Sequence, residues 1–291
     1  MVGETILLPS SGTQCALVVA HPGHEVRVHG WLESTQPRVC ILTDGSGNTG
    51  RSRLHSTTIL LAECGAQRGP IYGHLTDLAV YQAILNQDCD LFIKLACELA
   101  DTFVCAQVEC VVGDAIEGYN SVHDVCRLII DAAVELSKRA SRRQIANFDF
   151  PVVGRPDACP EDLRSNALWL HLDRDAFARK LQAARTYYPE LLDEVANTVN
   201  GTDRGVYRAY LDYVAEADPS VECLELDSFR VECLRPVEHR KWKTIFSERP
   251  PFFEYHGERQ VAAGRYQQVI RFSEHLKPLA EGLCNYVGVN A

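Results

Sequence analysis

CALVVAHPGHE, residues 15–25, places a run of small and β-branched apolar residues directly before two histidines and a glutamate. Such a run is typical of a strand that is buried on both faces, as in a parallel sheet. Its end delivers His21, His24 and Glu25 to one polar loop. Two histidines three positions apart can bind a metal ion, and they can equally be surface residues of a turn. Their spacing alone leaves both interpretations open.

Beyond this first strand, short β-type runs alternate with longer helical patterns. One β-type run, Arg38–Thr43, ends at Asp44, and another, Val108–Val112, is followed by Asp114. Helical patterns cover residues 51–65, 81–103 and 124–139. This alternation predicts βαβ units, and therefore an α/β fold with a mostly parallel sheet flanked by helices.

The second half of the chain predicts fewer strands. A connection rich in Pro and Gly at 151–164 leads to a strand at 167–172, and a helical pattern follows over 173–199. We predict an α/β domain over residues 1–199 that carries the polar loops. A mostly helical extension over residues 200–291 is expected to pack on the same unit.

The extension contains an aromatic stretch, PPFFEY, at Pro250–Tyr255. Here we predict either a turn with exposed aromatic side chains or a loop folded over another part of the molecule, followed by a last helix over 258–283. The exposed rings have two interpretations that the sequence does not separate. They form either a lid over a ligand pocket or a subunit contact of a homo-oligomer.

The composition is that of a soluble globular protein, with 46% apolar and 23% charged residues among 291. A formal net charge of −10 argues against nucleic-acid binding, which depends on basic surface. No apolar run approaches the roughly 18–20 residues of a membrane span, and the first residues do not resemble an export signal. The 12 cysteines are scattered without a C-x-x-C pair, so we expect reduced thiols in a cytoplasmic protein.

Polar residues follow several of the predicted strands. Because the carboxyl ends of parallel strands meet at one edge of a sheet, we expect His21, His24, Asp44 and His123 to lie close together there. A catalytic zinc ion takes three protein ligands from His, Cys and carboxylate side chains and keeps one position for water. His123 starts a helix after a strand-end loop, so it is the best candidate for a third ligand beside His21 and His24.

The order of these motifs resembles the PIG-L/LmbE family of zinc-dependent de-N-acetylases. The family hallmark is Ala-His-Pro-Asp-Asp-Glu, and residues 20–25 read Ala-His-Pro-Gly-His-Glu. Residues 73–77, GHLTD, resemble a substrate-side turn of the family. Residues 118–123, GYNSVH, stand where the family has a glycine followed by His-Pro-Asp-His. The similarity covers about residues 15–195 and leaves the extension unexplained.

Carried over position by position, the resemblance implies a Rossmann-like, LmbE-like fold and a bound zinc ion. It implies three histidine ligands, namely His21, His24 and His123. Arg53 and Asp77 would face the substrate. Glu25 would support the ligands by accepting a hydrogen bond from an imidazole N–H.

The departures from the family concern acid–base chemistry. The first aspartate of the hallmark is the family's general base, and here that position is Gly23. A family histidine three residues before the last ligand is replaced by Asn120, which can donate a hydrogen bond to an oxyanion but cannot move a proton at neutral pH. Asp114 and Asp44 are the candidates for a replacement base.

We therefore predict a metal-dependent hydrolase, with zinc as the metal, that acts on an amide C–N bond of a polar small molecule. The resemblance implies deacetylation of an N-acyl, sugar-like compound. The absent base at Gly23 leaves two alternatives open. One is a family member that binds metal and ligand without hydrolysis, and the other is an esterase on the same scaffold.

Overall fold

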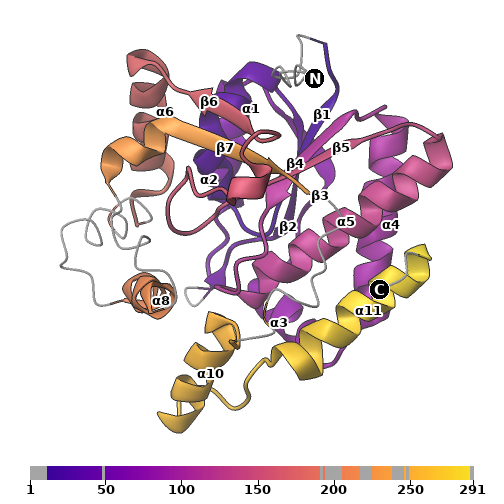
Figure 1. Ribbon diagram of the computed structural model, residues 1–291, viewed down its shortest axis with the longest axis vertical. Coiled ribbons are helices and arrows are strands. Elements are labelled where there is room, and N and C mark those ends of the chain that lie inside the picture. Colours follow the sequence, from indigo (N-terminus) through magenta and orange to yellow (C-terminus); the bar gives the residue numbers. More distant parts are fainter. Residues whose placement is uncertain are drawn as a thin grey trace.

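A seven-stranded sheet with helices on both faces forms the centre of the molecule (Figure 1). The computed structural model describes residues 12–47, 50–190, 193, 205–216, 225–237, 246 and 249–288. In chain order the strands are β1 Cys15–Val19, β2 Arg38–Thr43, β3 Gln67–Leu75, β4 Cys110–Asp114, β5 Ala146–Phe150, β6 Leu168–His171 and β7 Val231–Pro236. The mixed α/β architecture confirms the predicted fold class.

The strand order, β3-β2-β1-β4-β5-β7-β6, determines where polar loops meet. Strands β1 to β5 are parallel, and β1 pairs with both β2 and β4, in register Val18 to Gly113 on the β4 side. Strand β7 runs antiparallel to both β5 and β6. The order of connection reverses between β1 and β4, and ligands of open α/β sheets bind at such a switch point.

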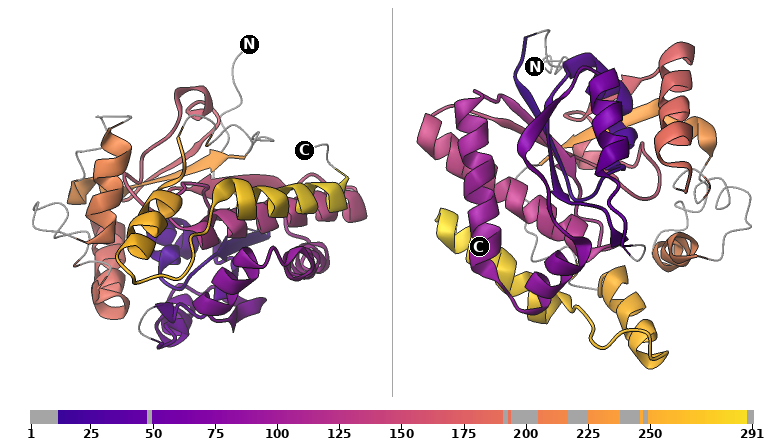
Figure 2. Two further views of the ribbon diagram at one scale, coloured as in Figure 1. Left: turned by 90° about the horizontal axis from the view of Figure 1, so that it is seen from below. Right: turned by 180° about the vertical axis from the view of Figure 1, so that it is seen from behind.

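Alternation along β1 divides the core into two layers. Ala16 and Val18 face one helical layer, whereas Leu17 and Val19 face the other, all 3% exposed or less. The first layer contains α3 Asp77–Leu85, α4 Cys89–Cys105, α5 Ser121–Ser141 and α11 Lys277–Val287. The second contains α1 His29–Thr35, α2 Leu54–Glu63 and α6 Arg174–Tyr187. The further views show α11 lying along α4 and α5 (Figure 2).

A third, smaller core lies beyond the sheet and is built mainly by the carboxyl-terminal part of the chain. It joins aromatic side chains of two further helices to residues of the β5–α6 region. These helices are α8 Val206–Ala215 and α10 Phe252–Ala262. Short helical segments are η1 His24–Val28, η3 Glu161–Leu163, η5 Leu226–Arg230 and η6 Phe272–Leu276.

Three predicted elements are wrong. The single helix over 81–103 is in fact α3 and α4, separated at Gln87, whose φ of 53° is left-handed. The Asp88 carboxylate accepts a hydrogen bond from the Leu91 N–H, so it caps the new helix. The turn at 250–255 is also wrong, because α10 begins at Phe252. The Phe252 ring is only 2% exposed, whereas Tyr255 is exposed as expected.

Three strands were not predicted from the sequence: β3, β5 and β7. Strand β3 contains Gly69, Pro70 and Gly73, which mask its pattern, and as an edge strand it tolerates the proline. The extension is helical in α8, α10 and α11 as predicted, and its β7 joins the same sheet. The single last helix expected over 258–283 is wrong, because α10 ends at Ala262 and α11 begins only at Lys277. The expected boundary at residue 199 lies outside the described residues. Among the described residues, no helix is long and apolar enough to cross a membrane.

A buried ion pair fastens β7 to the two neighbouring helices. Lys180 of α6 donates to Glu232 Oε1 (2.8 Å) and to the Arg27 carbonyl oxygen (2.7 Å). Glu232 of β7 also accepts the Gly30 and Trp31 N–H groups, each at 2.9 Å, in the first turn of α1. An anion is stabilised there by the helix dipole and its unpaired N–H groups.

We expect Lys180→Met to lower the free energy of unfolding by about 3–5 kcal/mol, because it leaves a buried carboxylate without its cation. The matched control is Arg179→Met, since Arg179 pairs with Glu33 on the surface and is itself 56% exposed. Such surface pairs contribute about 0–1 kcal/mol. Urea denaturation of both variants checks the difference, and equal losses would contradict a structural role for the buried pair.

Candidate functional site

Three imidazole rings converge at the switch point between β1 and β4. His21 and His24 lie on the loop after β1, and His123 lies in the first turn of α5, which follows β4. The ring centroids are 5.3 Å apart for His21 and His24, 5.1 Å for His21 and His123, and 4.5 Å for His24 and His123. The structure therefore brings together the three histidines that the sequence analysis grouped.

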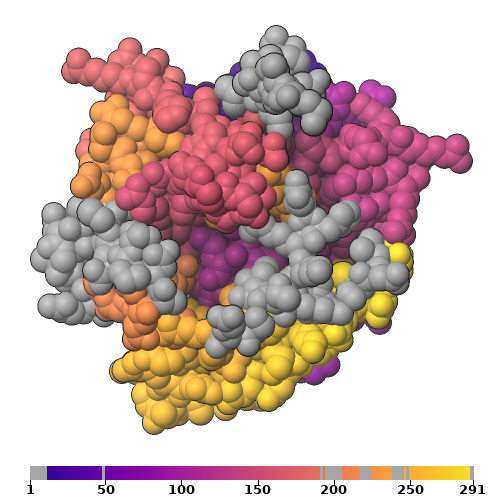
Figure 3. Space-filling view, in the orientation of Figure 1, coloured from indigo at the N-terminus to yellow at the C-terminus, as the bar shows by residue number. Residues whose placement is uncertain are grey.

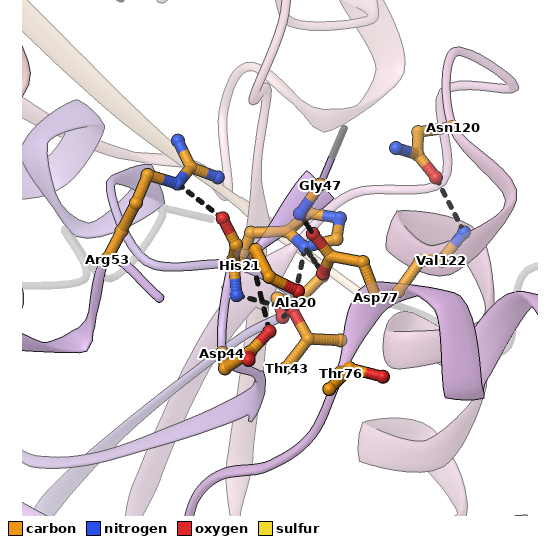
Figure 4. Close-up of polar contacts among 12 residues, drawn as sticks. Ala20, His21, Thr43, Asp44, Gly47, Arg53, Thr76, Asp77, Asn120 and Val122 are labelled. Carbon is orange, nitrogen blue, oxygen red and sulfur yellow. Dashed lines mark hydrogen bonds and ion pairs between the residues drawn. The ribbon is translucent and has the colours of Figure 1, made fainter. Parts of the chain in front are cut away.

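The orientation of the His21 ring is set by partners on two other segments (Figure 4). Its Nδ1 lies 2.8 Å from Thr43 Oγ1 and 2.9 Å from Asp77 Oδ1. Burial by itself raises the pKa of Asp77, but the hydrogen bond from His21 and the charge of that ring outweigh it, so the pKa lies well below its usual range. His21 Nε2 is buried and has no hydrogen-bond partner among the described residues. Asp77 is thus a partner of His21 as well as a residue of the cavity wall.

Asp114 holds the His24 ring in the same manner. Its Oδ2 accepts the Ala20 N–H (2.8 Å) and lies 2.9 Å from His24 Nδ1. Asp114 ends β4, is 0% exposed, and does not line the cavity. Burial raises its pKa to about 6. This position behind an imidazole is typical of a group that orients a metal-binding histidine.

The surroundings of His24 and His123 favour the neutral form of these two imidazoles. Burial, and then the neighbouring His21 ring and the cations of Arg53 and Arg27, lower the pKa of His24 well below its ordinary value. Burial, and then the His24 and His21 rings, lower the pKa of His123 in the same way. Neutral imidazole is the form that binds a metal ion.

The spacing of the rings agrees with a three-histidine metal site. Three imidazoles bound tetrahedrally at Zn–N distances of about 2.0–2.1 Å would have ring centroids roughly 5 Å apart. Yet as the side chains of the described residues lie, no group of three or more His, Cys, Asp and Glu could hold a metal ion. The donor types and the ring spacing fit zinc, but the side chains as they lie do not form a metal site.

The three histidines line one end of a cavity of about 1190 Å³. The space-filling view shows the molecule hollowed between the segment after β5, helix α8 and helix α10 (Figure 3). The cavity also reaches Arg53, Asn120 and Lys180. It combines a polar end at the sheet edge with walls from the carboxyl-terminal elements.

Asn120 and Arg53 come from different elements and lie on opposite sides of His21 in the close-up (Figure 4). Asn120 Oδ1 accepts the Val122 N–H (2.9 Å) as the cap of α5 and the Tyr81 hydroxyl (3.1 Å). With its oxygen occupied twice, the Asn120 amide presents its NH₂ group as the remaining donor. Arg53 Nε donates to the Gly45 carbonyl oxygen (3.0 Å), which holds the guanidinium at the cavity wall.

Two predicted site residues lie elsewhere than expected. Asp44 does not line the cavity, and its Oδ1 accepts the Ser46 N–H (3.0 Å) in the loop after β2. Glu25 was expected to support an imidazole, but it instead accepts the Gly23 N–H (2.7 Å) and the Tyr188 hydroxyl (2.5 Å). The supporting carboxylates are Asp77 and Asp114, because the side chain of Glu25 turns toward the second helical layer.

Tyr188 is a supporting residue that the sequence analysis did not find. Its hydroxyl contacts both Glu25 and Thr57, and the side chain is 1% exposed. Lys180, Ala184 and Tyr188 all line the cavity at four-residue spacing along α6 and its cap. That spacing is the signal that could have identified Tyr188.

Similarity to known proteins is limited to solved structures. The chain is similar to the A40926 pseudoaglycone deacetylase Dbv21, with 15% identity over 77% of this chain and 96% of that one, at a TM-score of 0.43. It is also similar to the zinc-inhibited form of the teicoplanin deacetylase Orf2, with 11% identity over 77% and 97% and a TM-score of 0.44. No protein-family profile and no curated protein matches the sequence. These values are too low to transfer the role of any residue.

We expect Tyr188→Phe to lower the free energy of unfolding by about 1–3 kcal/mol, because the buried Glu25 carboxylate loses a hydrogen-bond donor. The matched control is Tyr187→Phe, whose hydroxyl contacts Glu63 at an exposed position. The free energy of unfolding of Tyr187→Phe should stay within about 0.5 kcal/mol of the wild-type value, as for other surface substitutions. Thermal or urea denaturation of both variants measures these losses. Equal losses in the two variants would contradict a role for Tyr188 in supporting the loop that carries the histidines.

Proposed function

We propose that this protein is a zinc-dependent hydrolase that cleaves the amide bond of an N-acylated, sugar-like small molecule. The observation that carries the proposal is the convergence of three imidazoles, two of which are held through Nδ1 by the carboxylates of Asp77 and Asp114. The order of sequence motifs that resembles the PIG-L/LmbE family supports the same reaction. The substrate class rests on that resemblance.

His21, His24 and His123 would hold the metal, and filling the site calls for a change in the orientation of their rings. A bound zinc ion supplies Lewis-acid polarisation of a carbonyl and lowers the pKa of water. The Asn120 NH₂ group donates to the oxygen of the amide carbonyl as negative charge develops there. The Arg53 guanidinium orients an electronegative group of the substrate at the wall beside His24.

The second candidate is a protein that binds metal and ligand without hydrolysis. Gly23 has a φ of 110°, where side chains are rarely tolerated, so the loop itself is built without a carboxylate at this position. The carboxylates nearest the rings, Asp77 and Asp114, already accept hydrogen bonds from His21 and His24. Since a general base contributes about 10²- to 10⁴-fold, this observation favours slow or absent turnover.

Elemental analysis of the purified protein should find close to one zinc per chain, and the His24→Ala variant should lose it because three ligands become two. The control is His55→Ala, which removes an exposed histidine of α2 outside the cavity. Metal that is absent from the wild-type protein after incubation with zinc, or retained by His24→Ala, would contradict the three-histidine site.

Turnover should be measured with N-acetylglucosamine and with an acetate ester of similar size, each with and without a chelator. Amide cleavage that the chelator abolishes supports the hydrolase, and ester cleavage alone supports the esterase alternative. Asn120→Ala should lower kcat by about 10²- to 10³-fold, as for the loss of an oxyanion donor, with zinc content unchanged. Zinc-loaded protein that binds these compounds and cleaves neither supports the non-hydrolytic candidate.

A further inference from the structure

Exposed apolar side chains gather around the mouth of the cavity. Seven large apolar residues of the described chain are exposed, and four of them line this cavity. The four are Leu78, Val206, Leu226 and Tyr266, with exposed fractions of 64%, 43%, 42% and 47%. They come from α3, α8, η5 and the segment after α10. Scattered exposed apolar residues are ordinary, but their concentration at one opening marks a binding surface.

A continuous series of aromatic rings connects this mouth to the histidine cluster. The Tyr119 ring centroid lies 6.0 Å from that of His123 and 5.9 Å from that of Phe252, to which it is parallel within 2°. The Phe252 centroid lies 5.5 Å from that of His256, which in turn lies 6.4 Å from that of Tyr266. All five rings line the cavity. Large apolar surface is thus presented along the whole path from the rim to the polar end.

The rings of Tyr119, Phe252, His256 and Tyr266 form what we call the aromatic wall of the cavity. We propose that this wall binds a large apolar group of the substrate, namely an alkyl chain of about eight carbons or an aromatic ring system. The polar end beside the histidines would then hold the group to be cleaved. The inference rests on the proposed function for the second part only. A cavity of about 1190 Å³ exceeds the roughly 300–1,000 Å³ that small ligands usually occupy, so it has room beyond an acetylated monosaccharide.

The apolar group can stand on either side of the amide. It is either the acyl chain or a substituent at the sugar's anomeric position, and the chemistry of the wall is the same for both. Most of the wall comes from the extension, which the motif resemblance to residues 15–195 does not cover. The extension therefore sets the size of substrate that this chain accepts.

Two pairs of non-cleavable sulfonamide probes separate these sources. The first pair is N-(octanesulfonyl)- and N-(methanesulfonyl)glucosamine, and the second is the octyl and methyl glycosides of N-(methanesulfonyl)glucosamine. Calorimetry below the micelle concentration measures Kd. In one of the two pairs, the octyl probe should have a Kd about 100-fold lower than the methyl probe. Each fully buried methylene lowers Kd roughly fourfold, and the octyl group has seven more methylenes than the methyl group, so burial of about half of their surface accounts for this factor.

The rim variant Leu78→Ser/Tyr266→Ser should reduce this preference about tenfold. The matched control is Ile59→Ser/Tyr286→Ser, which changes two exposed apolar residues away from the cavity and should keep the preference intact. Both variants alter exposed side chains, so both should fold. Circular dichroism checks this, and Leu78→Asn/Tyr266→Asn replaces the rim variant if it does not.

Octyl and methyl probes that bind within about threefold of each other would overturn the inference, as would an equal preference in wild-type and rim variant. A rim variant that changes only the sedimentation of the protein would also overturn it, since the rim would then be a subunit contact. A preference that holds while no amide is cleaved would refute the proposed hydrolysis and leave the apolar site standing. Cleavage of N-acetylglucosamine by a protein that shows no preference for octyl probes would support the proposed hydrolysis and refute the apolar site.

Discussion

Two hydrogen bonds accepted by Asp114 are the constraint on which the site depends. Its Oδ2 contacts the Ala20 N–H at the end of β1 and Nδ1 of His24 on the following loop. One fully buried carboxylate at the end of β4 thereby fixes both the neighbouring strand end and the histidine beyond it. The strand order places β1 beside β4, and the switch point lies between them. This neighbourhood allows a carboxylate at the end of β4 to reach the end of β1.

The two carboxylates nearest the rings form hydrogen bonds with histidines. Asp77 orients His21, Asp114 orients His24, and Glu25 is paired with Tyr188 in the other direction. These carboxylates therefore hold the histidine rings in place, and neither Asp77 nor Asp114 is left as a free base. Gly23 is consistent with this division, because at its φ of 110° the backbone conformation disfavours the side chain that would supply the base.

The carboxyl-terminal part of the chain completes the molecule in two ways. Strand β7 enters the sheet between β5 and β6, where Glu232 joins Lys180 and the start of α1. Helices α8 and α10 add a third core whose aromatic residues continue into the cavity wall. Strand β7 thus stabilises that side of the sheet, and helices α8 and α10 shape the space in front of the histidines.

The sequence by itself determined the α/β class, the strands β1, β2, β4 and β6, and the grouping of His21, His24 and His123 as candidates, because a buried strand shows as an apolar run followed by polar residues. Only the tertiary structure decided which carboxylate supports which ring, since Asp77 and Asp114 are 56 and 90 residues away from their partners. It also decided the break at Gln87, the strand β7 and the aromatic wall. Local periodicity does not record these features, because they arise from contacts between segments that lie far apart in the chain.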